Sequence, residues 1–235
     1  MNKPFSAVAL KMIACITMFL DHMGYACDVL PTPLRLLFRI FGRIAFPVYC
    51  FLLVEGVSHT KDAKKYLLRL FILMLLAEPV FDLMCYRTPV YLQKQSVMVT
   101  LLMGAYMCIV MKSMPKFWMR LVMVIPFFYL IQLCRSDYST GGVLMIAMFM
   151  LTRDLPRRWL LQIPLLGLLC IYMGSWTISF RWFAIPVQWF AVLALIPILL
   201  YNGKKGSNNK ALNVSMNLFY PVHMAFIIII DAFFL

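Results

Sequence analysis

The sequence predicts an all-α fold, a polytopic helical bundle of about nine transmembrane helices. Hydrophobic residues make up 63% of the 235 residues and charged residues only 13%, with a mean hydropathy of +0.86. This composition leaves too little polar surface for a water-soluble globule, so lipid is the expected solvent. Apolar runs also alternate with short hydrophilic connections along the whole chain. We therefore expect a single integral-membrane domain over residues 1–235.

Each predicted span is an apolar run near the roughly 17 to 25 residues that cross a bilayer as a helix, which satisfies its own backbone amides. In chain order the nine segments are 5–24, 36–57, 66–84, 97–111, 117–133, 141–151, 159–174, 184–201 and 212–235. The first is interpreted as a span and not as a signal peptide, because Asp21 and His22 interrupt it and no small-residue cleavage site follows cleanly. The sixth is short. It is expected to be tilted, extended into its polar flanks, or joined with the fifth as a re-entrant pair.

The lysines and arginines assign a side to each connection. With the amino terminus in the cytoplasm and the carboxyl terminus in the periplasm, thirteen fall inside and five outside. The inside residues are Lys3, Lys61, Lys64, Lys65, Lys112, Lys116, Arg120, Arg153, Arg157, Arg158, Lys204, Lys205 and Lys210, and the outside residues are Arg35, Arg87, Lys94, Arg135 and Arg181. The net charge of +13 therefore reflects topology and contact with anionic lipid, and predicts no binding of nucleic acid.

The seven cysteines show no CxxC pair and no spacing typical of metal ligands, so no metal site is expected. Cys27, Cys85 and Cys134 fall near the predicted outer face, where two of them could form a disulfide. The sequence does not decide which pair, if any, forms.

Ionisable residues within the first two spans are the first candidates for a functional site, because charge at membrane depth is costly. His22 follows Asp21 at the outer end of the first span, where it could act as a general base or merely satisfy a helix carbonyl. Arg39 and Arg43 lie four residues apart, on one helix face, and require anionic partners. Lys11 lies about a third of the way into the first span, where it either extends toward the inner headgroups or lines a polar path.

Two further pairs lie in later spans. Glu78 and Asp82 are four residues apart and repel each other unless one is protonated or both meet arginine, so Arg39 and Arg43 are their expected partners. Such a cluster serves either the site or the architecture alone. In the last span, Tyr220 and His223 share a face at a kink that Pro221 is expected to produce.

Six stretches carry a resemblance to a known family. In order they read LKMIACITMFLDHMG, FGRIAFPVYCFLLVEGVSHTKDAKKYLLRL, AEPVFDL, VMVTLLMG, DYSTGGVL and FYPVHM. In this succession the chain resembles the TraX family of conjugative-transfer membrane proteins over essentially its whole length. The resemblance implies acetylation of the amino terminus of a conjugative pilin subunit, with acetyl-coenzyme A as donor, in the bacterial inner membrane. TraX proteins are also distantly similar to integral-membrane acyltransferases, in which a histidine toward the far end of an early helix serves catalysis, and His22 matches it by position.

The resemblance and the predicted topology together imply acyl transfer across the membrane. Lys61, Lys64 and Lys65 are expected to bind the nucleotide phosphates of acetyl-coenzyme A, with Lys11 and Arg43 deeper along the donor's path.

At the outer end, His22 is expected to take the proton of the pilin amine, with Asp21, Glu78, Tyr220 and His223 as the surrounding polar residues. Arg39 or Arg43 is expected to stabilise the oxyanion. Direct transfer and an acetyl-histidine intermediate on His22 both remain open.

Two functions of other classes are the alternatives. A proton-coupled transporter would use the same intramembrane charges, but would be expected to show two similar halves, which the sequence lacks. A non-catalytic membrane chaperone or scaffold for pilin would need only helix-packing surfaces.

Overall fold

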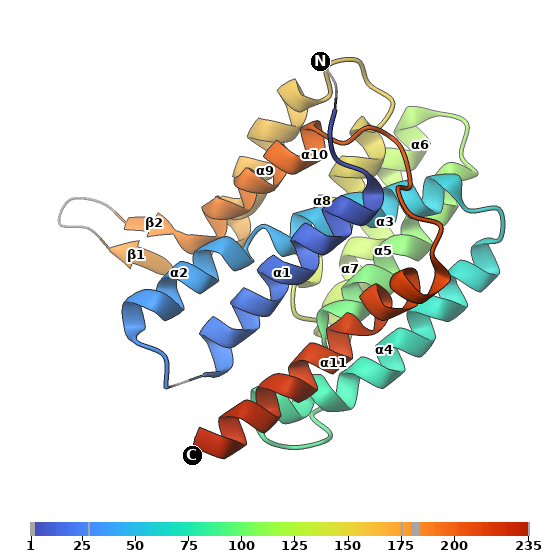
Figure 1. Ribbon diagram of the computed structural model, residues 1–235. Helices are drawn as coiled ribbons and strands as arrows, with labels where there is room; N and C mark the ends of the chain where they lie inside the picture. The colour runs from blue at the N-terminus through green and yellow to red at the C-terminus, as the bar shows by residue number, and fades with distance from the viewer. Residues whose placement is uncertain (1–2, 28, 175, 180–183, 235) are drawn as a thin grey trace. The chain divides into compact units, whose positions relative to one another are not determined.

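The computed structural model describes residues 3–27, 29–174, 176–179 and 184–234, and these residues are mainly helical (Figure 1). The elements are α1 (Ala7–Ala26), α2 (Thr32–Gly42), α3 (Ala45–His59), α4 (Ala63–Tyr86), α5 (Val97–Lys112), α6 (Phe117–Val122), α7 (Val124–Cys134), α8 (Ser139–Thr152), α9 (Trp159–Met173), β1 (Thr177–Ser179), β2 (Ala184–Pro186), the 3-10 helix η1 (Val187–Ala194), α10 (Leu195–Leu199) and α11 (Lys210–Phe234). The prediction of a mainly helical fold is confirmed, and its long apolar helices are consistent with a helical membrane protein. The short antiparallel hairpin of β1 and β2 was not predicted.

Four helical stretches within the described residues are long and apolar enough to cross a membrane. They are Ala7–Ala26, Thr32–His59, Phe117–Cys134 and Lys210–Phe233. Four shorter apolar helical stretches, of 10–17 residues, are Val97–Lys112, Ser139–Thr152, Trp159–Met173 and Val187–Leu199. The count of nine spans and the sides of the two termini stay predictions.

Three predicted spans are interrupted. The second divides between α2 and α3, the fifth divides at Met123, and the eighth begins with β2 and η1 before α10. In the eighth, residues Ala184–Pro186 pair with β1 as a strand, and Pro186 is the N-cap residue of η1, so the helical part of this segment begins only at Val187. The short sixth segment is the separate helix α8, extended at both ends into its flanks and not joined to α7.

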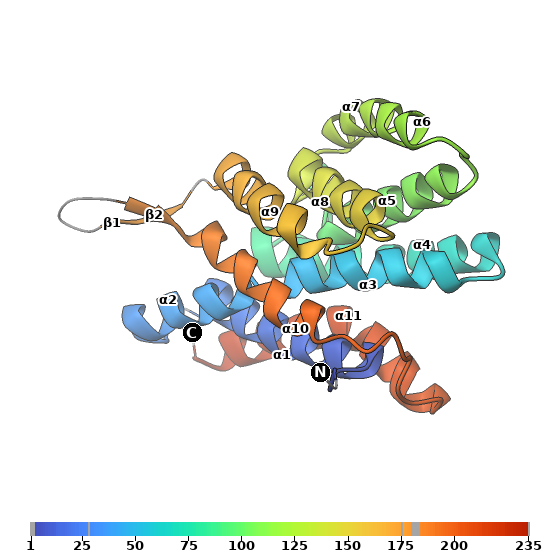
Figure 2. The same cartoon turned by 90° about the horizontal axis from the view of Figure 1, so that it is seen from above.

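The chain divides into two compact units, which we call unit 1 (Met1–Tyr49 with Leu166–Leu235) and unit 2 (Cys50–Leu165). In unit 1, α1 lies between α2 and α11, and η1 packs against α2 (Figures 1 and 2). The amino terminus of α1 is closed by the segment before α11, because the N–H groups of Ala7 and Val8 donate to the carbonyls of Lys204 and Lys205 at 2.9 and 3.1 Å. These donors are therefore not available to an anion.

Unit 2 is built around α8, which packs against α5 and α7 and is buried along nearly its whole length. At one end of the unit, the Lys112 ammonium donates to the carbonyls of Val57 and Ser58, and Arg153 donates to Glu55 at 3.0 Å. The basic connections that follow α3, α5 and α8 therefore meet at the same end.

The connections after α4 and α7 meet at the opposite end of unit 2. Gln95 and Ser136 form an isolated β-bridge, and the ammonium of Lys94 lies 2.9 Å from the carboxylate of Asp137. Partial burial opposes the charge on Lys94, but Asp137 raises the pKa of Lys94 overall. Within unit 2, this alternation of ends agrees with the alternating sides assigned from lysine and arginine.

Close approach of α1 and α2 depends on Gly42. A Cβ at this position would lie 2.6 Å from Cγ of Asp21, much closer than side-chain atoms approach one another. The backbone of α2 at Gly42 therefore packs directly against the Asp21 side chain of α1, with no side chain of its own in between.

We expect Gly42→Ala to destabilise the protein by about 1–3 kcal/mol, the usual cost of overpacking. The measurement is thermal unfolding in detergent. Gly167→Ala is the matched control, because a Cβ there meets nothing within 4 Å and alanine favours a helix. Equal midpoints for the two variants would contradict a tight α1–α2 contact.

Candidate functional site

Two histidines from distant parts of the chain meet in unit 1. His22 near the end of α1 and His223 in the middle of α11 place Nδ1 and Nε2, respectively, 2.6 Å apart. The Nδ1 of His223 lies 2.6 Å from the carbonyl oxygen of Phe219, one helical turn earlier. His223 is buried, with 3% of its surface exposed, whereas His22 is partly exposed.

This arrangement fixes the tautomers of both neutral rings. A carbonyl oxygen only accepts, so Nδ1 of His223 carries its proton and donates to Phe219. Nε2 of His223 then has a lone pair and accepts from Nδ1–H of His22. The remaining ring nitrogen of His22, Nε2, is consequently left with a lone pair that can take a proton.

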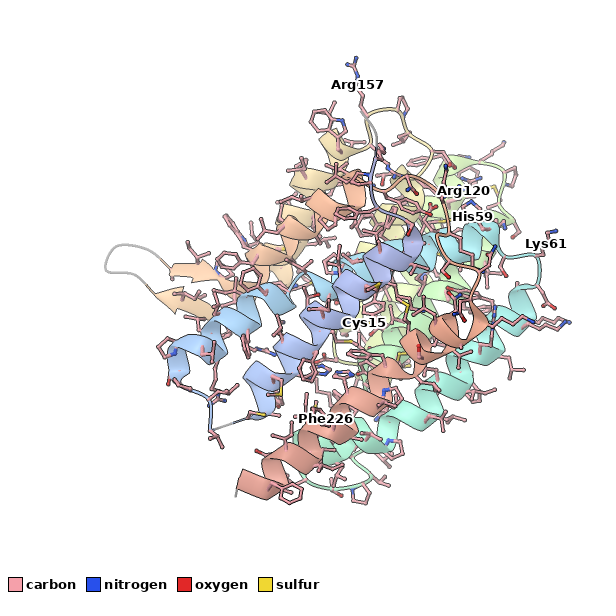
Figure 3. The ribbon with its side chains drawn as sticks, viewed as in Figure 1. Cys15, His59, Lys61, Arg120, Arg157 and Phe226 are labelled. Carbon is pink, nitrogen blue, oxygen red and sulfur yellow. The ribbon has the colours of Figure 1, made fainter. Side chains whose placement is uncertain are left out.

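Aromatic rings surround the histidine pair. The rings of Phe219 and His223 stack at 4.8 Å between centroids, and Tyr220 lies edge-on to both histidines at 6.1 and 5.9 Å. Phe19 of α1 packs between His223 and Phe226, and Figure 3 labels Phe226 on α11. The predicted common face of Tyr220 and His223 thus points toward α1, and it holds His22 in an apolar setting.

Asp21 forms an ion pair with two arginines of α2. Its Oδ2 accepts from Nη1 of Arg39 at 2.9 Å, and its Oδ1 accepts from Nη2 of Arg43. The three side chains are only 12–21% exposed. Arg39 and Arg43 do share a helix face, and the carboxylate on that face belongs to the residue before His22.

The predicted partnership of Glu78 and Asp82 with these arginines is therefore corrected. Both carboxylates bind the connection that follows their own helix in unit 2. Glu78 accepts from the backbone N–H of Ser96 at 2.8 Å and from its hydroxyl at 2.6 Å, and Asp82 accepts from the N–H of Tyr91 at 2.7 Å. Both oxygens of Glu78 and one oxygen of Asp82 therefore have partners in the connection that follows α4, which gives Glu78 an architectural position.

A buried amide completes the charged cluster of unit 1. Oε1 of Gln188, on η1, accepts from Nη1 of Arg43 at 3.4 Å. The side chain of Gln188 is not ionisable, so a search for charged residues in apolar runs does not single it out. The only sequence signal is its place as the one amide side chain in the strongly apolar segment 184–201.

The predicted donor-binding lysines lie in different units. Lys11 of α1 donates to the side-chain amide oxygen of Asn217 on α11, so it has a protein partner at depth. Lys61, Lys64 and Lys65 are exposed at the start of α4 in unit 2.

Figure 3 shows Lys61 extending away from the ribbon. Asp62, between these lysines, caps α4: the N–H of Lys65 donates to it at 3.0 Å and lowers the pKa of this carboxyl.

The cysteines and possible metal ligands add no further site. All seven cysteines are free thiols in the structure, including Cys27, Cys85 and Cys134. Among the described residues, no group of three or more His, Cys, Asp or Glu side chains could hold a metal ion.

Comparison with known proteins gives two matches. The family model described as TraX protein matches residues 6–231. A probable fimbrial assembly protein, FimC of serogroup H1, from Dichelobacter nodosus is 28% identical over 255 residues, which cover 95% of each chain. No solved structure matches the chain.

We expect Asp21→Asn to destabilise the protein by about 3 kcal/mol, at the lower end for a broken buried ion pair, because two guanidinium groups lose their carboxylate. Thermal or denaturant unfolding in detergent measures this loss. Asp62→Asn is the control, since asparagine still caps a helix and the exposed pair with Lys65 contributes little. An Asp21→Asn protein as stable as the Asp62→Asn protein would show that the cluster does not hold α1 to α2.

Proposed function

Because this chain belongs to the TraX family, we propose that it is a membrane-embedded acetyltransferase that acts on a conjugative pilin subunit. It transfers an acetyl group from acetyl-coenzyme A to the amino-terminal amine of pilin, in the bacterial inner membrane. The name of the relative, a probable fimbrial assembly protein, supports pilin or a fimbrial subunit as the partner. The amino terminus lies in the cytoplasm and His22 faces the opposite side.

The observation that carries this proposal is the hydrogen-bond chain from His22 through His223 to the Phe219 carbonyl. A general base needs a lone pair held in one orientation, and this chain supplies it at Nε2 of His22. His223 acts as the positioning residue, because it accepts from His22 only in the tautomer that Phe219 fixes.

The transfer needs one proton acceptor and one leaving group. His22 removes a proton from the pilin amine as its nitrogen attacks the thioester carbonyl carbon, so that a C–N bond forms and the C–S bond breaks. The sulfur leaves as a thiolate and receives the proton held by His22, which restores the base. An acetyl group carried briefly on Nε2 of His22 is the two-step form of the same reaction.

Acetyl-coenzyme A is compatible with the described residues at its phosphate end. Its phosphates need exposed cations, and Lys61, Lys64 and Lys65 provide three within five residues. Lys112 and Arg153 nearby already bind protein groups, so they are weaker candidates.

We expect His22→Ala to abolish acetylation of pilin, because it removes the lone pair that His223 and the Phe219 carbonyl hold in one orientation. Mass spectrometry of the pilin amino terminus, after coexpression at matched protein levels, measures the acetyl mass. His59→Ala is the control. His59 is exposed in unit 2, where its Nδ1 lies 2.8 Å from the backbone carbonyl oxygen and 3.8 Å from the carboxylate of Glu55.

Two results distinguish the alternatives. Acetylated pilin from the His22→Ala strain would remove His22 from the mechanism. Pilin that stays unmodified in a strain with the wild-type protein, together with loss of pilus assembly when the gene for this protein is deleted, would indicate the non-catalytic chaperone or scaffold.

Replacement of Lys61, Lys64 and Lys65 with glutamate is expected to raise the KM for acetyl-coenzyme A by at least about tenfold, since charge-assisted hydrogen bonds contribute about 1.5–3 kcal/mol each. Steady-state kinetics at varied donor concentration measures it. Lys204→Glu with Lys205→Glu is the matched control, because both lysines belong to the segment that closes α1. If the control raises KM and the triple variant does not, the nucleotide binds at unit 1.

A further inference from the structure

The rings of His22 and His223 meet edge to edge. Nδ1 of His22 lies 2.6 Å from Nε2 of His223, the ring centroids are 4.8 Å apart, and the ring planes differ by only 9°. This centroid separation is nearly the sum of the nitrogen–nitrogen distance and the two ring radii, so the rings lie almost in one plane. An imidazole lone pair lies in the plane of its ring, so the N–H of His22 points along the lone pair of His223.

The surroundings of His223 can hold a positive charge on its ring. The Phe219 carbonyl accepts from Nδ1–H of His223 at 2.6 Å, and this bond becomes stronger when the donor ring is charged. The Phe219 ring also stacks on the His223 ring, with centroids 4.8 Å apart and planes 10° apart, and an aromatic face attracts a cation. A proton added at Nε2 of His223 therefore leaves both contacts with Phe219 in place.

The charge beside His22 has the opposite effect. The cluster that begins one residue earlier pairs the single carboxylate of Asp21 with the guanidinium groups of Arg39 and Arg43, so it carries a net positive charge. Because α1 lies between α2 and α11, His223 is separated from this cluster by α1. A positive charge is thus repelled less on His223 than on His22.

We propose that His223, in addition to orienting His22, accepts its Nδ1 proton whenever Nε2 of His22 bonds to an electrophile. This inference rests on the proposed acetyl transfer, in which that electrophile is either the proton of the pilin amine or the acetyl group. The positive charge then resides on His223, against Phe219, and His22 stays neutral. The short, straight hydrogen bond between the rings is the path of the proton.

The protons balance in both forms of the reaction. In direct transfer, Nε2 of His22 gains the amine proton and its Nδ1–H bond breaks as an N–H bond forms at Nε2 of His223. The leaving thiolate then takes the proton from Nε2 of His22, and His223 returns its proton to Nδ1.

In the two-step form, a C–N bond to Nε2 of His22 forms as the C–S bond breaks, and loss of the Nδ1 proton leaves a neutral acetyl-histidine. When the amine takes the acetyl group, His223 returns the proton to His22, and the proton that the amine loses neutralises the thiolate released earlier.

Two substitutions separate proton uptake from orientation alone. His223→Gln keeps an oxygen that accepts from His22 but cannot take up its proton, whereas His223→Phe removes both abilities. We expect both variants to lose kcat by about 10²–10⁴-fold, the usual contribution of a proton-transfer group, with little change in KM for acetyl-coenzyme A. His59→Gln is the matched control and is expected to keep wild-type kcat. Wild-type kcat in His223→Gln would overturn the proposal and leave His223 with orientation alone.

Nitrogen NMR tests the proton position without substitution of the pair. The chain has three histidines, so ¹⁵N-labelled His59→Gln protein shows only His22 and His223. The ¹⁵N signals distinguish a ring nitrogen that carries a proton from one that does not, and they are recorded as the pH is lowered. Within the described part of unit 1, the charged and titratable groups that face the pair are Asp21 of α1, Arg39 and Arg43 of α2, and Tyr220 of α11.

We expect the first proton that the pair takes up to appear at Nε2 of both rings, while Nδ1 of His22 loses its proton. A pair in which Nε2 of His22 becomes protonated and Nε2 of His223 stays bare overturns this inference alone. Pilin that the wild-type protein leaves unacetylated overturns the proposed function, whichever ring holds the proton.

Discussion

The carboxylate of Asp21, shared by Arg39 and Arg43, is the interaction on which the organisation of unit 1 depends. Guanidinium groups at membrane depth must be neutralised within the protein, because lipid offers no counter-ion and little water. The shared carboxylate meets this need and brings α2 against α1 at Gly42. It also sets the rotation of α1: the next residue, His22, points about 100° away from Asp21 and so faces α11 and not α2.

Apolar run length predicts the helices of this chain well and their interruptions poorly. The seventh segment, 159–174, corresponds to α9 (Trp159–Met173), because hydrophobicity over a long window is a strong signal. The eighth contains a strand, a 3-10 helix and a short α-helix, although its composition is equally apolar. Its shape follows from the pairing of β2 with β1 and from Pro186 at the start of η1, which are tertiary and single-residue effects that a hydropathy window averages away.

The site was predictable where it depends on helical spacing and not where it depends on partners. Spacing of three and four residues correctly placed Tyr220 with His223, and Arg39 with Arg43, on shared faces. The counter-ion of the arginines was assigned to Glu78 and Asp82, because depth in a span does not reveal which helix lies alongside. Gln188 escaped notice for a related reason: a neutral amide becomes conspicuous only when its burial and its missing partner are known.

The choice of a second histidine to orient His22 follows from the same charge constraint. A carboxylate in place of His223 would add a negative charge beside the rings of Phe19 and Phe219. The neutral His223 ring donates from Nδ1 to the Phe219 carbonyl and accepts at Nε2, so it offers His22 an acceptor without adding a charge. Donation to a carbonyl of its own helix also holds the ring at a fixed angle. The polar residues of unit 1 thus form two groups, a charged cluster that joins α1 to α2 and a hydrogen-bonded histidine pair that joins α1 to α11.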